Sequence, residues 1–223
     1  PYRVNVDVTV EAGDTLTLEA GVIVAFTGRY KLTVFGGLDA RGTAEQRIVF
    51  TTSSPELTWW GMLVDHCVTH GDGICSVEPA SILPTTLQFA VIENARKDDC
   101  CARDWFAGGA LNFTGRDAQD NQLRILNTIF RNDYAIDGNG GLHLMLGNAL
   151  VFGCLFEGCV SGSTGSAFGF EHGGGRVLNS TVVGGNGLGA IDSFDMGTEM
   201  NNLLTGNTDA IRGWGNVHVR WDM

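Results

Sequence analysis

The stretch Leu123–Asn132, LRILNTIFRN, decides the fold, because four other segments of the chain repeat its pattern. These segments are LQFAVIEN ending at Asn94, ALVFGCLFEG ending at Gly158, GRVLNSTVVGG ending at Gly185 and TEMNNLLTG ending at Gly206. Each has two adjacent apolar residues, one variable residue and then Asn or Gly. Aligned on the residue before the apolar pair (Ala90, Thr128, Cys154, Thr181 and Asn202), the segments are spaced by 38, 26, 27 and 21 residues.

A second series of short segments follows the first in phase. Its anchor residues are Ala110, Leu142, Ala167, Ala190 and Ala210, spaced by 32, 25, 23 and 20 residues. Two short β-like segments that recur together at this period predict a solenoid, in which each turn stacks on the last. A single turn cannot cover its own apolar face, so stacking is expected to place one interior column at Ile129, Leu155, Val182 and Leu203.

The beginning of the chain, residues 4–64, alternates apolar and polar residues and has Gly at its bends. The segments are VTVEAGDTLTLEAGVIVAF, KLTVFGGLDARGTAEQRIVFTTS and WWGMLV, and their alternation indicates strands buried on one face. Residues 8–64 resemble the opening turns of bacterial secreted right-handed parallel β-helix repeat proteins, and residues 87–215 resemble looser turns of the same kind. The resemblance implies an all-β, right-handed parallel β-helix spanning residues 1–223 as one domain, secreted or exposed on a cell surface.

Three polar segments interrupt the repeats. We predict that residues 66–85, 95–107 and 114–121 project from the solenoid as loops, between the N-terminal turns at 4–64 and among the repeated turns at 87–215. Asn94 and Asn132 close their segments and are interpreted as turn formers that tolerate a left-handed backbone.

Charge and composition exclude some partners. The net charge is −11, with only two lysines, which argues against binding to a nucleic-acid backbone. No apolar run approaches the 18 residues of a membrane span. We expect no cofactor and no structural metal; calcium is an alternative that the acidic composition allows and no ligand motif supports.

Six cysteines, an even number, favour an oxidising compartment. All six are disulfide candidates: Cys67, Cys75, Cys100, Cys101, Cys154 and Cys159. Cys67 and Cys75 bracket a short polar loop, and a bridge from Cys159 to the 95–107 insertion is compatible with the spacing of stacked strands.

The acidic groups best placed for catalysis lie in the later turns. An enzyme of this family that cleaves polysaccharides needs carboxylates on neighbouring turns of one face. The candidates are Asp192, Asp195, Glu171 and His172, where Glu171 and His172 form a possible proton-transfer pair and the alternative is a pair of polar residues at a bend. His143, in an apolar strand, is equally compatible with a catalytic and a structural side chain.

Aromatic residues offer a binding surface instead. Exposed rings stack on sugar faces, and the candidates are Trp59, Trp60, Trp105 and Phe106, although Trp59 and Trp60 also fit a role in capping the core. Asn112 and Arg212 are the polar ligand-binding candidates. Asn112, Asp192 and Arg212 each follow their anchor by two residues, so we expect them to point the same way. Asp192 beside Arg212 is interpreted first as a surface ion pair.

The sequence therefore supports three hypotheses. The first is an extracellular or cell-surface module for structure or recognition that binds carbohydrate or another surface partner, without enzymatic activity. The second is a polysaccharide lyase or glycoside hydrolase acting on the solenoid face. The third is a structural subunit that forms homo-oligomers by end stacking, because the end of a solenoid carries unpaired strand edges.

Overall fold

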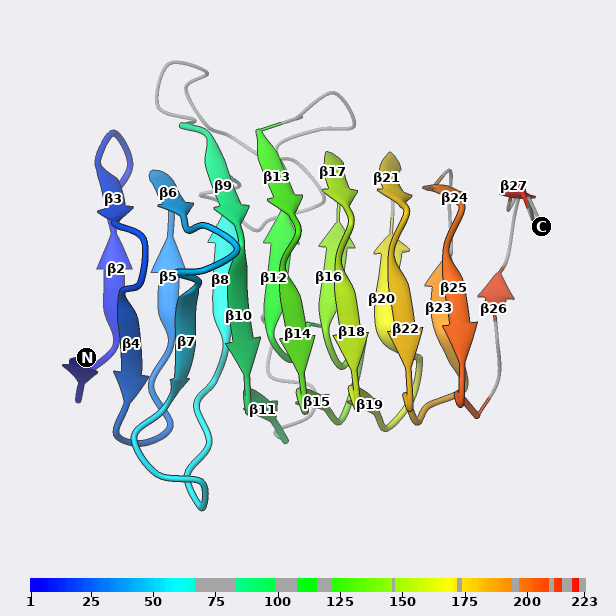
Figure 1. Ribbon diagram of the computed structural model, residues 1–223, viewed down its shortest axis with the longest axis horizontal. Coiled ribbons are helices and arrows are strands. Elements are labelled where there is room, and N and C mark those ends of the chain that lie inside the picture. The colour runs from blue at the N-terminus through cyan, green and yellow to red at the C-terminus, as the bar shows by residue number, and fades with distance from the viewer. Residues whose placement is uncertain are drawn as a thin grey trace, which may run out of the picture.

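The computed structural model describes residues 1–66, 83–98, 108–115, 122–145, 147–171, 174–193, 197–208, 211–213 and 218–220. These residues form 27 β-strands and contain no helix, and all their paired strands are parallel. The chain is all-β, as the sequence predicts. The strands lie side by side along the long axis, from the N-terminus at one end to the C-terminus at the other (Figure 1).

Three eight-stranded sheets and one three-stranded sheet make up the structure. Sheet I contains β2 (Val8–Val10), β5 (Leu32–Val34), β8 (Met62–Asp65), β12 (Leu111–Thr114), β16 (Leu142–Met145), β20 (Gly165–Glu171), β23 (Gly189–Ser193) and β26 (Ile211–Gly213). Sheet II contains β3 (Thr15–Leu18), β6 (Gly37–Arg41), β9 (Thr85–Gln88), β13 (Leu123–Leu126), β17 (Asn148–Phe152), β21 (Gly174–Leu178), β24 (Gly197–Met200) and β27 (His218–Arg220).

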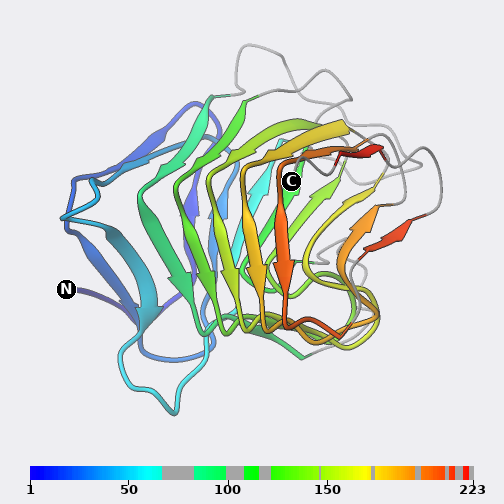
Figure 2. The same ribbon diagram turned by 45° about the vertical axis from the view of Figure 1, so that its right-hand side comes forward.

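Sheet III contains β1 (Tyr2–Val4), β4 (Ile23–Phe26), β7 (Ile48–Thr52), β10 (Ala90–Glu93), β14 (Ile129–Arg131), β18 (Leu155–Glu157), β22 (Thr181–Val183) and β25 (Leu203–Thr205). Sheet IV contains β11 (Arg96–Lys97), β15 (Tyr134–Ala135) and β19 (Val160–Ser161). After β1, the chain passes through sheets I, II and III in the same order in every turn, and sheet IV follows sheet III in three of the turns. This periodic order is consistent with a β-helix or solenoid (Figure 2).

Corners with a left-handed backbone fix the length of the sheet III strands. From β10 onward, each strand lies between two residues of positive φ that are five positions apart. The pairs are Phe89 and Asn94, Asn127 and Asn132, Gly153 and Gly158, Asn179 and Gly184, and Asn201 and Gly206. Asn and Gly adopt this conformation at little cost. The interpretation of Asn94 and Asn132 as left-handed turn formers is confirmed.

The apolar core runs through the middle of the stack. Its row from sheet III consists of Phe50, Ile92, Phe130, Phe156 and Val182, each at most 1% exposed. The rings of Phe130 and Phe156 stack with their centroids 4.7 Å apart. Burial of each such side chain contributes about 1.5–3 kcal/mol.

The predicted interior column is wrong for three of its four members. Ile129, Leu155 and Leu203 face outward, and Leu203 is 59% exposed. The structure pairs Thr181 with Leu155, one residue away from the alignment that the sequence suggested. Because side chains alternate along a strand, this shift of one residue places Val182 on the opposite face from Ile129, Leu155 and Leu203. Only Val182 points inward as predicted.

The same shift affects the second series, where Leu142 pairs with Leu111 instead of Ala110. The loop predictions change at their edges: β9 begins at Thr85, and β11 lies inside the predicted loop 95–107 because Arg96 and Lys97 pair with β15. The rest of the predicted loops, residues 67–82, 99–107 and 116–121, lies outside the described residues.

Candidate functional site

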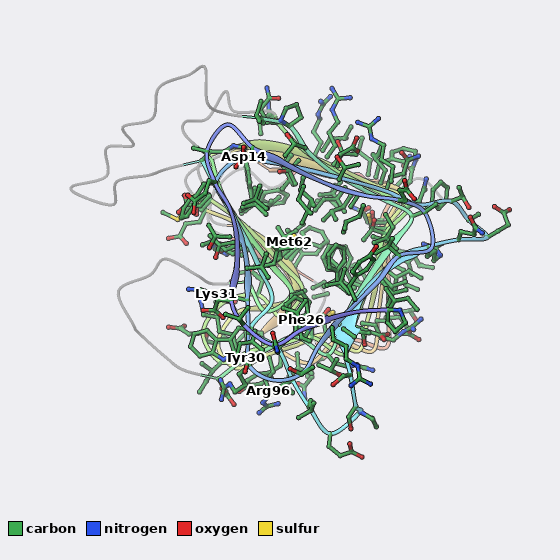
Figure 3. The ribbon with its side chains drawn as sticks, turned by 90° about the vertical axis from the view of Figure 1, so that its left-hand side faces the viewer. Asp14, Phe26, Tyr30, Lys31, Met62 and Arg96 are labelled. Atoms are coloured by element: carbon green, nitrogen blue, oxygen red, sulfur yellow. The ribbon has the colours of Figure 1, made fainter. Side chains whose placement is uncertain are left out.

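Five side chains from four successive turns meet on the surface beside sheet IV. We call them the Trp60–Tyr134 cluster, and they are Arg29, Trp60, Arg96, Asp98 and Tyr134. The cluster lies on the edge where the chain passes from sheet III to sheet I. Figure 3, a view along the stack from its N-terminal end, shows Arg96 on this edge and Phe26 inside the stack.

Backbone pairing places the members of the cluster at successive levels. The amide of Trp60 donates to the carbonyl of Tyr30 in the preceding turn, with N and O 2.9 Å apart. Arg96 belongs to β11, which pairs with β15 so that Arg96 lies opposite Tyr134. The turns are about 4.8 Å apart, so rings and guanidinium groups follow one another along the edge.

The side chains of the cluster contact one another directly. The Arg29 guanidinium lies 5.2 Å from the centroid of the Trp60 ring, and the Arg96 guanidinium lies 4.2 Å from that of Tyr134. Asp98 joins the two halves, because it accepts a hydrogen bond from Arg29 and another from Arg96 Nε at 3.3 Å. The Arg29 and Arg96 side chains remain 47% and 46% exposed.

Charge balance within the cluster keeps Asp98 ionised. Burial acts to raise the pKa of this carboxyl, but the hydrogen bond and charge of Arg29, together with the hydrogen bond from Arg96, lower it on balance. The cluster therefore combines two partly exposed rings, two cations and one carboxylate at the surface.

Trp59 does not take part in a binding surface, although the sequence made it a candidate. Its side chain is 0% exposed and stacks on Phe26, with ring centroids 4.2 Å apart, and its indole N–H donates to the Glu93 carbonyl at 2.9 Å. The capping alternative is the one that the structure supports for Trp59. Trp60 is partly exposed and belongs to the cluster.

A polar row crosses the outer side of sheet I. The register aligns Asn112, His143, Gly169, Asp192 and Arg212, so the prediction that Asn112, Asp192 and Arg212 share a row is confirmed. Asp192 is 1% exposed and Asn112 is 2% exposed. Neither is a freely accessible surface group, and the burial of Asn112 argues against the ligand contact expected for it. The ion pair expected between Asp192 and Arg212 stays a prediction, because the Arg212 side chain is not among the described side chains.

The ring of His143, in this row, contacts Asn139 and Glu171. Its Nδ1 lies 2.9 Å from Asn139 Oδ1, and Asn139 Nδ2 donates to the Gly165 carbonyl at 3.1 Å. Because the Asn139 amide is oriented by that second bond, its oxygen accepts a hydrogen bond from the N–H at His143 Nδ1. The basic nitrogen is then Nε2, which lies 3.4 Å from Glu171 Oε2. Glu171 therefore has His143, on the directly paired strand of the preceding turn, as a partner.

Several predicted site residues lie outside the described residues. They are Asp195, His172, Trp105, Phe106, Cys67, Cys75, Cys100 and Cys101. For Arg212 the structure describes the backbone position in β26 and no side chain. Glu171 and Asp192 lie on the same face of the adjoining strands β20 and β23, where Asp192 pairs with Gly169, two residues before Glu171.

Cys154 and Cys159 are free thiols, so the proposed bridge from Cys159 to the 95–107 insertion is wrong. Both are 1% exposed, and the Cys159 thiol points toward the Phe130 carbonyl at 3.7 Å, inside the core. Burial raises the pKa of Cys154 to about 12 and raises that of Cys159 as well, which leaves both protonated and unreactive. In the described part of the chain, no group of three or more His, Cys, Asp or Glu side chains could hold a metal ion.

Sequence reasoning found Trp60 but missed Arg29, Arg96, Asp98 and Tyr134. Arg29 and Asp98 are 69 residues apart, so only the register of the turns brings them together. The signal available in the sequence was the second residue after each Asn corner: Arg96 follows Asn94 by two positions, and Tyr134 follows Asn132 by two positions.

The chain matches no family model, no curated protein and no solved structure. No helix among the described residues is long and apolar enough to cross a bilayer.

Proposed function

We propose that the chain is a right-handed parallel β-helix, secreted or exposed on a cell surface, that recognises carbohydrate through the Trp60–Tyr134 cluster. The β-helix is supported by the unvarying order of sheets I, II and III and by the strong preference of parallel crossovers for the right hand. Export is supported by the resemblance of residues 8–64 to secreted β-helix proteins.

The observation that carries the recognition proposal is the combination of two rings and two guanidinium groups on one edge. Sugars present apolar C–H faces and a rim of hydroxyl groups, so their binding sites combine flat aromatic surfaces with a few polar groups. Arg29 and Arg96 are each held against a ring, which reduces the entropy lost when they bind a ligand. Asp98 supplies an acceptor for hydroxyl donors.

A glycan array followed by calorimetry on the hits tests this proposal. Trp60→Ala and Tyr134→Ala are each expected to weaken binding about tenfold, by removal of a ring face. Tyr2→Ala is the matched control, because Tyr2 is an aromatic residue that is 69% exposed on β1 and lies outside the cluster. Glycan binding that survives both cluster variants, or that Tyr2→Ala weakens as strongly, would refute this site.

A second candidate function is enzymatic cleavage of a polysaccharide, favoured by the contact between His143 and Glu171. Glu171 has a side chain that is 34% exposed, while His143 lies behind it and is 5% exposed. In this mechanism Glu171 donates or accepts the proton at the substrate and His143 Nε2 holds the proton between steps. Asp192 lies on the adjoining strand but is 1% exposed, so it does not act directly on the substrate in this mechanism.

A reducing-end assay on pectin, alginate and chondroitin tests the enzymatic candidate. Cleavage that Glu171→Gln and His143→Gln abolish, and that Glu157→Gln leaves intact, would establish it and overturn a purely binding function. Glu157 is the control because it is a half-exposed carboxylate on sheet III, 46% accessible.

End-to-end self-association is a third candidate, favoured by the open N-terminal end. A cavity of about 510 Å³ lies there, lined mainly by apolar side chains of the first turns such as Val4, Val8, Leu16 and Phe26. In the described part of the chain, β1, β2 and β3 are each the terminal strand of their sheet and have a partner strand on one edge only. Light scattering over a range of concentrations tests it: a mass that stays at one chain at every concentration excludes it.

A further inference from the structure

Two arginines stand in one row on the outer face of sheet II. Arg124 in β13 pairs with Leu150 in β17, which pairs with Arg176 in β21. The three strands are neighbours in the stack (Figure 1). Arg124 and Arg176 are both exposed, and two strand spacings separate them by about 9.6 Å along the long axis.

Among the residues that the structure describes, neither arginine side chain has a hydrogen bond or an ion pair. The four strands β9, β13, β17 and β21 contain no Asp or Glu. By contrast, Arg41 on the neighbouring strand β6 is paired with Asp39, with N and O 2.7 Å apart. On a chain of net charge −11, two uncompensated cations at a fixed spacing form a local positive strip.

An apolar row runs beside this strip. Leu126, Phe152 and Leu178 are in register two residues further along the same three strands. Phe152 is 39% exposed, and both leucines are partly exposed. The face therefore combines a line of guanidinium groups with a parallel line of apolar surface.

We propose that this face binds an acidic polysaccharide built from uronic acids, lying along the stack across β13, β17 and β21. The carboxylates of the polymer meet Arg124 and Arg176, whose planar guanidinium groups match a carboxylate in a two-pronged geometry. The apolar faces of the sugars lie on Leu126, Phe152 and Leu178. A straight polymer with a regular repeat suits a strip whose spacing the backbone pairing fixes.

The chemistry of the strip distinguishes this partner from other polyanions. A nucleic acid draws its affinity from many phosphate contacts and the counterions they release, and two arginines on an acidic chain supply few of these. An acidic peptide offers carboxylates without a continuous apolar face for the Phe152 row. The site lies on sheet II, so it does not depend on the Trp60–Tyr134 cluster.

Calorimetry with oligogalacturonates of increasing length tests the proposal on the whole chain. Affinity is expected to rise sharply once the oligomer spans about 9.6 Å, because both arginines then engage one ligand. Arg124→Gln and Arg176→Gln are each expected to weaken binding about threefold and the double variant about tenfold. Arg3→Gln is the matched control, since Arg3 is exposed on β1 and loses the same charge.

The outcomes separate this site from the other proposals. Binding that Trp60→Ala leaves unchanged and that the double arginine variant weakens supports the strip, whatever the glycan array shows for the cluster. Equal affinity of the double variant and the native chain overturns it. So does an equal loss in Arg3→Gln, or equally tight binding of methyl-esterified oligomers or of polyglutamate, since these results reduce the effect to net charge or to sugar stacking alone.

Discussion

Phe130 and Ile129 are adjacent in β14, yet they belong to opposite faces of sheet III. Phe130 is 0% exposed and stacks on Phe156, whereas Ile129 belongs to an outward row that ends at Leu203, 59% exposed. Both rows are largely apolar, so hydrophobicity alone does not distinguish them. The left-handed corners do, because they fix where each strand begins and therefore which residue points inward.

The largest expected effect on stability is the difference between an aspartate in the inward row and one in the outward row. Phe130→Asp places an unpaired carboxylate in the core and is expected to cost more than about 5 kcal/mol, comparable to the whole stability of a domain. Ile129→Asp is expected to cost about 1 kcal/mol, because that side chain faces outward. Circular dichroism with urea titration measures both.

A graded variant keeps this prediction testable if Phe130→Asp does not fold. Phe130→Ala is expected to lower the free energy of unfolding by about 3–5 kcal/mol, and Ile129→Ala by much less. Equal losses in the two alanine variants would show that the assignment of faces is wrong.

The corner after β14 contains a buried carboxyl group, Asp133, and the equivalent position of a later corner holds an amide side chain, Asn207. Asp133 is 0% exposed and accepts a hydrogen bond from the Ala95 amide at 2.9 Å, and burial raises its pKa well above the usual range. Three turns later, Asn207 Oδ1 accepts from the Gly185 amide at 2.8 Å and its Nδ2 donates to the Val182 carbonyl at 3.0 Å. An amide therefore fits this position without a proton to be gained or lost.

Asp133→Asn is expected to remove a pH dependence of stability. With a raised folded pKa, the contribution of Asp133 is fully present below the unfolded pKa of about 3.9 and is lost as pH rises toward the folded value. In that window the free energy of unfolding of the native chain falls by about 1.4 kcal/mol per pH unit from this group. Urea titrations at several pH values from 4.5 to 7 measure it; the same slope in both proteins would mean that Asp133 is ionised in the folded state.

The sequence predicted the stack of parallel turns but not the orientation of their faces. Repeated apolar pairs were sufficient for the first, since each turn needs neighbours to cover it. They were insufficient for the second, because Val182 and Val183 are both apolar and allow two alignments one residue apart. Alignment on the left-handed residues, such as Asn132 and Gly158, gives the observed register.

The candidate site was less predictable than the fold, for a different reason. Trp60 stands out by residue type, but its role in the cluster depends on the contact with Arg29. Arg29 in turn forms a hydrogen bond with Asp98, which is 69 residues away in the sequence. Such contacts follow from the number of residues in each intervening turn, which the insertions make irregular. The sequence made Glu171 a catalytic candidate but left the role of His143 open, because the contact between the two side chains also depends on the register of the turns.

Alanine substitutions at two glycine corners, Gly158 and Gly184, are expected to have smaller effects on stability and to differ from each other. Gly158 and Gly184 have φ of +61° and +64°, so an alanine at either position costs about 1–2 kcal/mol of backbone strain. A Cβ at Gly158 would lie 2.8 Å from Asn132 Oδ1, whereas a Cβ at Gly184 has no neighbour within 4 Å. Gly158→Ala is therefore expected to be more destabilising by about 1 kcal/mol.

Thermal melts of the two glycine variants measure this difference. Asn132→Gly is the matched background, because it removes the side chain that a Cβ at Gly158 would meet. In that background the two alanine substitutions should cost the same. A difference that persists there would show that the stacking of Asn132 over Gly158 does not set the cost.

The smallest expected effect belongs to the charged row next to Ile129 on the outer face. Arg131 Nε lies 2.8 Å from Glu157 Oε2, and Arg131 also pairs with Glu93 at 3.5 Å. The hydrogen bond to Glu157 is the main cause that raises the pKa of Arg131, against an opposing effect of burial. These side chains are 39%, 46% and 21% exposed for Arg131, Glu157 and Glu93, so solvent screens the attraction.

Arg131→Gln is accordingly expected to cost about 0.5 kcal/mol at low salt and less at high salt. A double-mutant cycle with Glu157→Gln, measured by urea titration at two salt concentrations, isolates the coupling. Arg131 is adjacent to Phe130 in the sequence, yet the stability expected to be lost in Arg131→Gln is about a tenth of that expected to be lost in Phe130→Asp. A coupling above about 2 kcal/mol that salt does not reduce would mean that this row is not solvated, and that the outer face of sheet III is covered by a partner.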